Sequence, residues 1–126
     1  MKLILAAVAT ASLLACAVSA SAQTRTLDTF VTEANRIPLN PTSAIRSDAR
    51  RLVREFNASM SAVSIEVRTA RAAGRTPPAC PPERIQMNPR QLLDYLNAIP
   101  QTRRRQMTPT DGIRGWLASR YPCPAA

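Results

Sequence analysis

One apolar stripe runs through residues 45–70, and it constrains the fold more than any other feature of the chain. Apolar residues recur there every three or four positions, which places them along one side of a helix. Thr42 or Ser43 stands where an N-cap is expected, and Gly74 stands where the helix would end. The stripe predicts one long amphipathic helix, and its members are Ile45, Ala49, Leu52, Phe56, Met60, Val63, Val67 and Ala70, widened by Val53 and Ala62.

Three shorter helices are expected around the long one, each followed by a proline. The first begins at Leu27, and the others begin where an N-cap residue precedes a proline, at Asn88 and Thr108. No segment sustains a period of two, so we expect no strand. The sequence therefore predicts an all-α fold, a small four-helix domain. The apolar faces of the short helices are Leu27, Phe30, Val31, Ala34 and Ile37, then Leu92, Leu93, Leu96 and Ile99, then Ile113, Trp116, Leu117 and Tyr121.

The N-terminus has the pattern of a secretory signal peptide. Lys2 precedes an almost wholly apolar run, residues 3–18, which is shorter than the roughly 20 residues that a membrane-spanning helix needs. An A-x-A cleavage site ends at Ala22. We expect residues 1–22 to be removed and residues 23–126 to form one helical domain in the periplasm or outside the cell, without a transmembrane segment.

The same N-terminal run contains an alternative processing site. Leu13-Leu14-Ala15-Cys16 resembles a bacterial lipobox, in which Cys16 would be lipidated and become the mature N-terminus. The protein would then be an outer-membrane lipoprotein. The other interpretation is that Cys16 is one more small apolar residue of the signal peptide.

Two cysteines, Cys80 and Cys123, remain after either route of processing. An even number of cysteines in an exported domain of this size favours a disulfide. A reactive thiol is the alternative, but the chain has no His and no C-x-x-C motif to activate one. We therefore predict a Cys80–Cys123 bridge that closes the second half of the chain.

The composition argues against an enzyme. The chain has no His, so it has no imidazole base and no His-ligated metal. Its only Lys is Lys2, and the serines at positions 59, 61 and 64 are expected to form a polar flank of the long helix. Asp48, Glu55 and Glu66 each lie near an Arg, which is typical of ion pairs on a helix surface. We predict no catalytic residue, no cofactor and no metal site.

The chain is strongly basic, with a net charge of +9 at pH 7. Every cation after the signal peptide is an Arg; Arg46, Arg50 and Arg54 form an i,i+4 stripe, and residues 103–105 are a run of three. Arg favours bidentate contacts with carboxylates and phosphates. We expect a docking surface for an acidic protein or an anionic envelope polymer, and the alternative is a solvated face. Export argues against nucleic acid. The candidate partner-binding residues are Arg90, Arg103, Arg104 and Arg105.

From Cys80 onward the chain resembles the Rap/Tai family of periplasmic immunity proteins of bacterial type VI secretion. The resemblance rests on Cys80-Pro81, on Tyr95-Leu96 followed by Pro100, on Leu117, and on Tyr121-Pro122-Cys123. It covers residues 80–123. Members are small α-helical proteins that bind and block peptidoglycan amidase toxins. The resemblance implies an inhibitor of a peptidoglycan hydrolase, and it also implies that Cys80 pairs with Cys123.

Three functions remain open at this point. The first is an exported binding protein of the immunity type with one tight protein partner. The second is a general envelope protein that binds anionic components through its arginines, and the third is a periplasmic stress chaperone. A homodimer is a further candidate assembly. The chaperone is disfavoured because the chain is poor in groups that titrate as a trigger.

Overall fold

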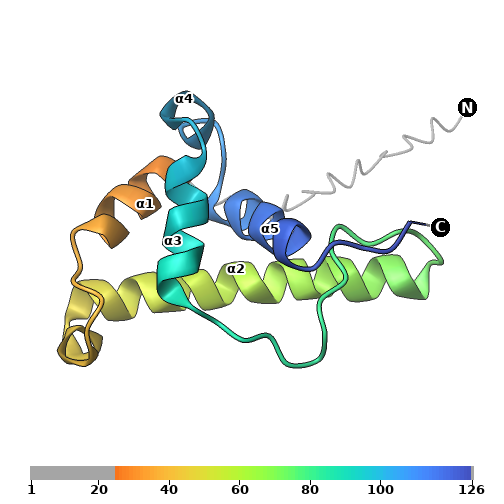
Figure 1. The fold of residues 1–126 in the computed structure, drawn as a ribbon, viewed down its shortest axis with the longest axis horizontal. Helices are drawn as coiled ribbons and strands as arrows, with labels where there is room; N and C mark the ends of the chain where they lie inside the picture. Colours follow the sequence, from red (N-terminus) through yellow and green to blue (C-terminus); the bar gives the residue numbers. More distant parts are fainter. Residues whose placement is uncertain (1–24, 126) are drawn as a thin grey trace, which may run out of the picture.

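The computed structural model describes residues 25–125 as an assembly of helices (Figure 1). The described part contains no strand, which confirms the all-α prediction. It has one long helix and one disulfide, as expected, and two short helices, η1 and α4, in addition to the four predicted. The elements are α1 (Leu27–Asn35), the 3-10 helix η1 (Pro41–Ile45), α2 (Ser47–Ala72), α3 (Pro89–Ala98), the one-turn helix α4 (Gln101–Arg104) and α5 (Pro109–Arg120).

The predicted signal peptide, residues 1–22, and the lipidation site Cys16 lie outside the described residues. Export and lipidation therefore stay predictions. Within residues 25–125, the structure holds no helix that combines the length and the apolar character needed to span a bilayer.

Local capping residues set most of the helix starts. Thr26 accepts a hydrogen bond from the Thr29 amide at 3.2 Å and so caps α1. The Asn88 side chain accepts from two amides at the start of α3. At α5 the Thr108 hydroxyl accepts from the Asp111 amide, and the Asp111 carboxylate accepts from the Thr108 amide, which completes a capping box.

The predicted cap of the long helix is wrong. Asn40 caps η1 instead, and its side-chain oxygen accepts hydrogen bonds from both the amide and the hydroxyl of Ser43. The backbone then turns extended at Arg46, with φ −71° and ψ 140°, and α2 begins there without a side-chain cap. Because Ile45 precedes this break, it is out of register with the stripe and is 80% exposed.

The C-terminus of α2 is closed by a Schellman motif. Gly74 takes the left-handed conformation, with φ 68°, which Gly adopts without steric cost. Its amide donates to the Arg71 carbonyl, and the Arg75 amide donates to the Ala70 carbonyl. The prediction that Gly74 ends the long helix is confirmed.

The core lies between α2 and α5 and extends between α1, α3 and α5. The largest helix contact is between α5 and α2, and these helices run in the same direction, since Thr110 faces Ser59 and Arg114 faces Glu66. Trp116 is buried, as predicted. The buried apolar cluster is Leu27, Phe30, Val31, Leu52, Val63, Val67, Ala79, Leu92, Leu96, Ile113, Trp116 and Leu117.

Two glycines of α5 allow close packing of other side chains. A Cβ on Gly112 would lie 2.8 Å from both terminal methyl carbons of Leu27, whose side chain is completely buried. A Cβ on Gly115 would lie 2.8 Å from the hydroxyl oxygen of Tyr95, which is only partly buried. The buried Leu27 side chain therefore has no room to move away from a Cβ at position 112, whereas the partly buried Tyr95 side chain can shift away from a Cβ at position 115.

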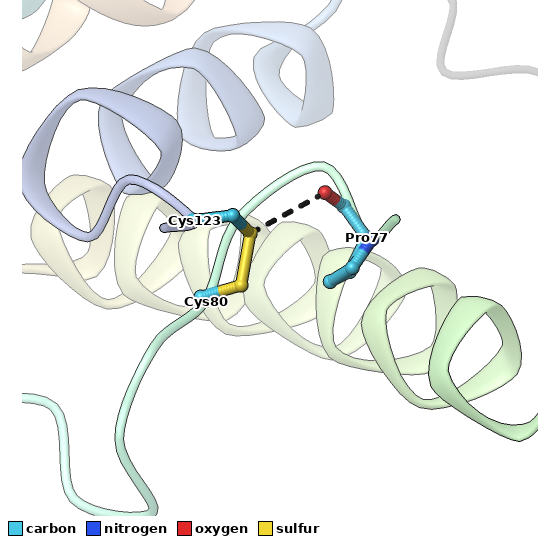
Figure 2. The surroundings of a disulfide bond; sticks show 3 residues. All are labelled: Pro77, Cys80 and Cys123. Atoms are coloured by element: carbon cyan, nitrogen blue, oxygen red, sulfur yellow. Dashed lines mark hydrogen bonds between the residues drawn. A yellow bond between two sulfur atoms is a disulfide. The ribbon is translucent and has the colours of Figure 1, made fainter. Parts of the chain in front are cut away.

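The Cys80–Cys123 disulfide is present, which confirms the predicted bridge (Figure 2). It ties the proline-rich segment after α2 to the end of α5, where the Cys80 amide also donates to the Tyr121 carbonyl at 2.9 Å. The Sγ of Cys123 lies 3.6 Å from the Pro77 carbonyl oxygen. This is a packing contact, since an oxidised sulfur has no proton to donate.

Candidate functional site

An apolar concave surface lies between α1, the N-terminal half of α2 and the start of α3. Its volume is about 460 Å³. We call it the apolar groove. Asn57 is the one polar residue in its wall, which consists of Phe30, Ala34, Ile37, Leu39, Ala49, Leu52, Val53, Phe56, Asn57, Met87, Pro89, Leu92 and Leu93.

The groove exists because α3 packs mainly on α1 and α5 and contacts α2 less. A reciprocal side-chain pair, Asn35 and Asn97, joins α1 to α3 with hydrogen bonds of 2.9 and 3.1 Å. The start of α3 and the N-terminal half of α2 both contribute side chains to the groove wall. The apolar side chains of α2 that face this space keep part of their surface in water.

Three large apolar side chains of the groove are well exposed. Leu39 is 50% exposed, Val53 56% and Met87 38%. Only two other large apolar side chains in residues 25–125 are as exposed, Ile45 and Ile65. Val53 was expected to widen a buried stripe, and the structure corrects this: it faces the groove and the solvent. A cluster of exposed apolar side chains in one hollow is typical of a binding surface.

Charged pairs hold α1 and α5 to α2. Arg25 contacts Glu33 at 2.6 Å and Glu55 at 3.2 Å. The hydrogen bond from Arg25 lowers the pKa of the Glu33 carboxyl below its ordinary value. At the other end of the domain, Arg114 contacts both Glu66 and Asp111 at 2.7 Å. The hydrogen bond from Arg114 likewise lowers the pKa of Glu66 and so favours its charged form.

The predicted carboxylates and serines show no catalytic arrangement in the described residues. Asp48 pairs with Arg46, which precedes α2, and Glu66 pairs with Arg114 of α5, so neither makes an ion pair within the long helix. Ser59 is not on a polar flank as predicted. It is completely buried, and its oxygen lies 3.3 Å from the Thr110 hydroxyl at the contact between α2 and α5. Within residues 25–125, no group of three or more metal-ligating side chains comes together.

The three arginines of residues 103–105 do not form one surface. Arg104 is half-buried, and its guanidinium contacts the Asp28 carboxylate at 3.1 Å and donates to the carbonyls of Asn97 and Ile99. It thereby links the end of α3 to the start of α1. Arg103 is exposed without an ion pair, and Arg105 is 3.9 Å from Asp28. The structure therefore places Arg104 in the scaffold.

Most arginines have no acidic partner in the structure. Of the 16 in residues 25–125, six take part in ion pairs and ten do not. Six of the eight acids are in those pairs, which leaves Glu83 and Asp94. The unpaired positive charge therefore far exceeds the unpaired negative charge. The arginines without an ion pair are Arg36, Arg50, Arg54, Arg68, Arg71, Arg75, Arg84, Arg90, Arg103 and Arg120.

Four of these unpaired arginines flank the apolar groove. Arg50 lies one helical turn before the groove residue Val53 on α2, and Arg54 lies one turn before the groove residue Asn57. Arg36 directly precedes the groove residue Ile37. Arg90 follows the groove residue Pro89 and lines a small hollow that adjoins the groove at Leu93. Of the predicted partner-binding residues, only Arg90 lies here. We call the four the basic rim.

The groove was missed by sequence reasoning. Its α2 wall was assigned to the buried stripe, and no binding role was expected for Leu39 or for Met87, which was assigned to a hydrophobic staple with Leu92. The available signal was the width of the apolar stripe, because Val53 lies beyond the arc that one neighbouring helix covers. Comparisons of the chain with protein-family models, with curated proteins and with solved structures find no match. The resemblance of residues 80–123 to Rap/Tai immunity proteins therefore stays a prediction.

Proposed function

We propose that this chain is an exported helical binding protein of the immunity type, which binds a protein partner through the apolar groove. The partner class that the sequence resemblance implies is a peptidoglycan amidase toxin, blocked by the bound protein. The observation that carries the proposal is the clustering of Leu39, Val53 and Met87 in one open hollow. Such exposed apolar surface is stabilised when a partner covers it.

Covering the exposed groove side chains contributes measurably to the free energy of binding. Full burial of a Leu, Val or Met side chain contributes about 1.5–3 kcal/mol. The three groove side chains are each about half exposed, so covering them contributes about 3 kcal/mol, or roughly 150-fold in Kd. The partner's own apolar side chains add to this. The Cys80–Cys123 bridge and the ion pairs of α1 and α5 keep the scaffold rigid, which lowers the entropy cost of binding.

A pull-down from periplasmic extract tests this function. The tagged protein is washed at low and at high salt, and the retained proteins are identified by mass spectrometry. We expect one hydrolase, retained in equimolar amount at high salt, because apolar contacts are not screened. Purified hydrolase should then lose activity on addition of the protein. Retention of no hydrolase would contradict the immunity function.

A second function is favoured by the ten unpaired arginines. A general envelope protein could use them to bind anionic components through exposed charge contacts. Such contacts weaken as salt rises. Capture of many acidic components that are all lost in the high-salt wash would select this function over the first.

A further inference from the structure

We infer that the apolar groove takes a short amphipathic helix from a partner protein, and that this helix carries acidic residues beside its apolar face. The inference rests on the proposed function and adds the chemistry of the segment that is recognised. It is carried by three features of the groove: its length along α2, its open side and the charge of its rim.

The length of the groove matches two helical turns. Its wall on α2 extends from Ala49 to Asn57, which are eight residues apart. At about 1.5 Å per residue this is roughly 12 Å, and two turns of a bound helix rise about 10.8 Å. A helix of that length presents apolar anchors at positions i, i+3 or i+4, and i+7, the pattern by which helices bind in grooves.

The open side of the groove calls for an amphipathic occupant. Because Leu39, Val53 and Met87 are 50%, 56% and 38% exposed, the groove covers one side of an occupant and leaves its other side in water. A hydrocarbon chain would keep apolar surface exposed there. An amphipathic helix places its polar side in the solvent instead.

The rim selects an acidic occupant. Arg36, Arg50, Arg54 and Arg90 have no ion pair within the described chain. The one unpaired acid beside them is Asp94, next to the groove residue Leu93. A second copy of this chain would bring an equally basic rim and a net charge of +9, so like charges would meet. Glutamates or aspartates that flank the apolar face would pair with the rim.

A peptide titration tests the occupant directly. The probe is a fluorescent peptide of about 14 residues, with leucines at i, i+3 and i+7 and glutamates beside them. One control keeps the leucines and replaces every glutamate with lysine, and another scrambles the order. With the purified protein, we expect the glutamate peptide to bind at least about tenfold more tightly than either control.

Matched variants locate the binding. Val53→Glu puts a negative charge in the groove and should weaken the glutamate peptide at least about tenfold. Ile65→Glu is the control, because Ile65 is 55% exposed on the same helix and lies outside the groove. It should change the Kd less than about twofold, and circular dichroism checks that both variants fold. The Arg50→Gln/Arg54→Gln double variant keeps the apolar wall, and it should reduce both the affinity and its dependence on salt.

Several results would overturn the inference. The first is that the scrambled peptide binds as tightly as the glutamate peptide, and the second is that Val53→Glu and Ile65→Glu lose the same affinity for the glutamate peptide. The third is that laurate, an anionic amphiphile that is not a helix, binds more tightly than the glutamate peptide. A dimer in sedimentation that Val53→Glu dissociates would make a second copy the occupant. If a hydrolase in the pull-down is retained by Val53→Glu as well as by the wild type, the immunity function stands, but the groove is not its binding site and the groove inference is wrong. If no hydrolase is retained but the glutamate peptide binds as expected, the immunity function fails and the groove inference stands.

Discussion

Removal of the Cys80–Cys123 bridge is expected to lower the stability of this domain by about 4 kcal/mol. The two cysteines are 43 residues apart, and the closed loop contains α3, α4 and α5. The chain-entropy treatment gives about 4 kcal/mol for a loop of this length. Small domains have a total free energy of unfolding of about 5–15 kcal/mol, so the bridge supplies a large share.

The effect should appear in the melting temperature and not in the folded structure. The bridge lies at the edge of the domain, while the contact between α2 and α5 is made by buried side chains that do not depend on it. In a domain of about 100 residues, each kcal/mol shifts the Tm by at least about 4 °C. We therefore expect a helical circular dichroism spectrum at 25 °C with or without reductant, and a Tm that falls by about 16–32 °C on reduction.

The Cys80→Ala/Cys123→Ala variant provides the control. It should melt near the temperature of the reduced wild type, and reductant should not lower its Tm further. A fall in the Tm of less than about 5 °C in the reduced wild type would refute the reasoning, because the loop-closure contribution would then be absent. Loss of helix at 25 °C on reduction would refute the separate claim that the α2–α5 core holds without the bridge.

Three further perturbations test the packing and the charges. Arg104→Ala should lower the free energy of unfolding in urea by about 2 kcal/mol, because it removes half-buried, charge-assisted hydrogen bonds. The control Arg103→Ala should lower it by less than about 0.5 kcal/mol. Equal losses in the two variants would contradict the scaffold role of Arg104. Gly112→Ala should destabilise the domain by about 1–3 kcal/mol, because the new Cβ would meet the buried Leu27 side chain, which cannot move. Gly115→Ala should be neutral or stabilising, because helix propensity rises by about 1 kcal/mol. The reverse order of the two melting temperatures would be the contrary result. Because the pKa of Glu66 is lowered, its contribution to stability is present above the ordinary value of 4.5 and is lost as the pH falls through the folded value. The Tm should therefore stay constant from about pH 8 to 5.5 and fall in acid, and it should fall less steeply in Glu66→Gln. A Tm that declines between pH 8 and 6 would disagree, because the chain has no His to titrate there.

Much of the fold could be predicted because its signals are local. The start of α5 is decided by Thr108, Pro109 and Asp111, which lie within three residues of one another. The end of α2 is decided by a single Gly that can take a positive φ. The apolar stripe of the long helix depends only on the spacing of residues that are one helical turn apart. Such signals act over three to five residues, so they can be found in the sequence before any tertiary contact is known.

The surface chemistry could not be predicted in the same way. The sequence presents residues 103–105 as three equivalent arginines, yet Arg104 pairs with Asp28, 76 residues away, and Arg103 does not pair at all. The predicted cap of α2 was also wrong, because Asn40 and Pro41 form a 3-10 turn that shifts Ile45 out of the apolar stripe. The pairing of Arg104 depends on where a distant element lies, whereas the 3-10 turn follows from a local signal that was missed.

The amino-acid sequence by itself determined an all-α domain, the limits of most of its helices, its excess of arginine and its pair of cysteines. The tertiary structure alone decided that Val53 and Met87 stay exposed in one groove and that the arginines around this groove lack acidic partners. The physical reason is that periodicity shows which face of a helix is apolar, while the distance between helices decides how much of that face is covered. Here α3 packs on α1 and α5 and leaves part of the apolar face of α2 uncovered.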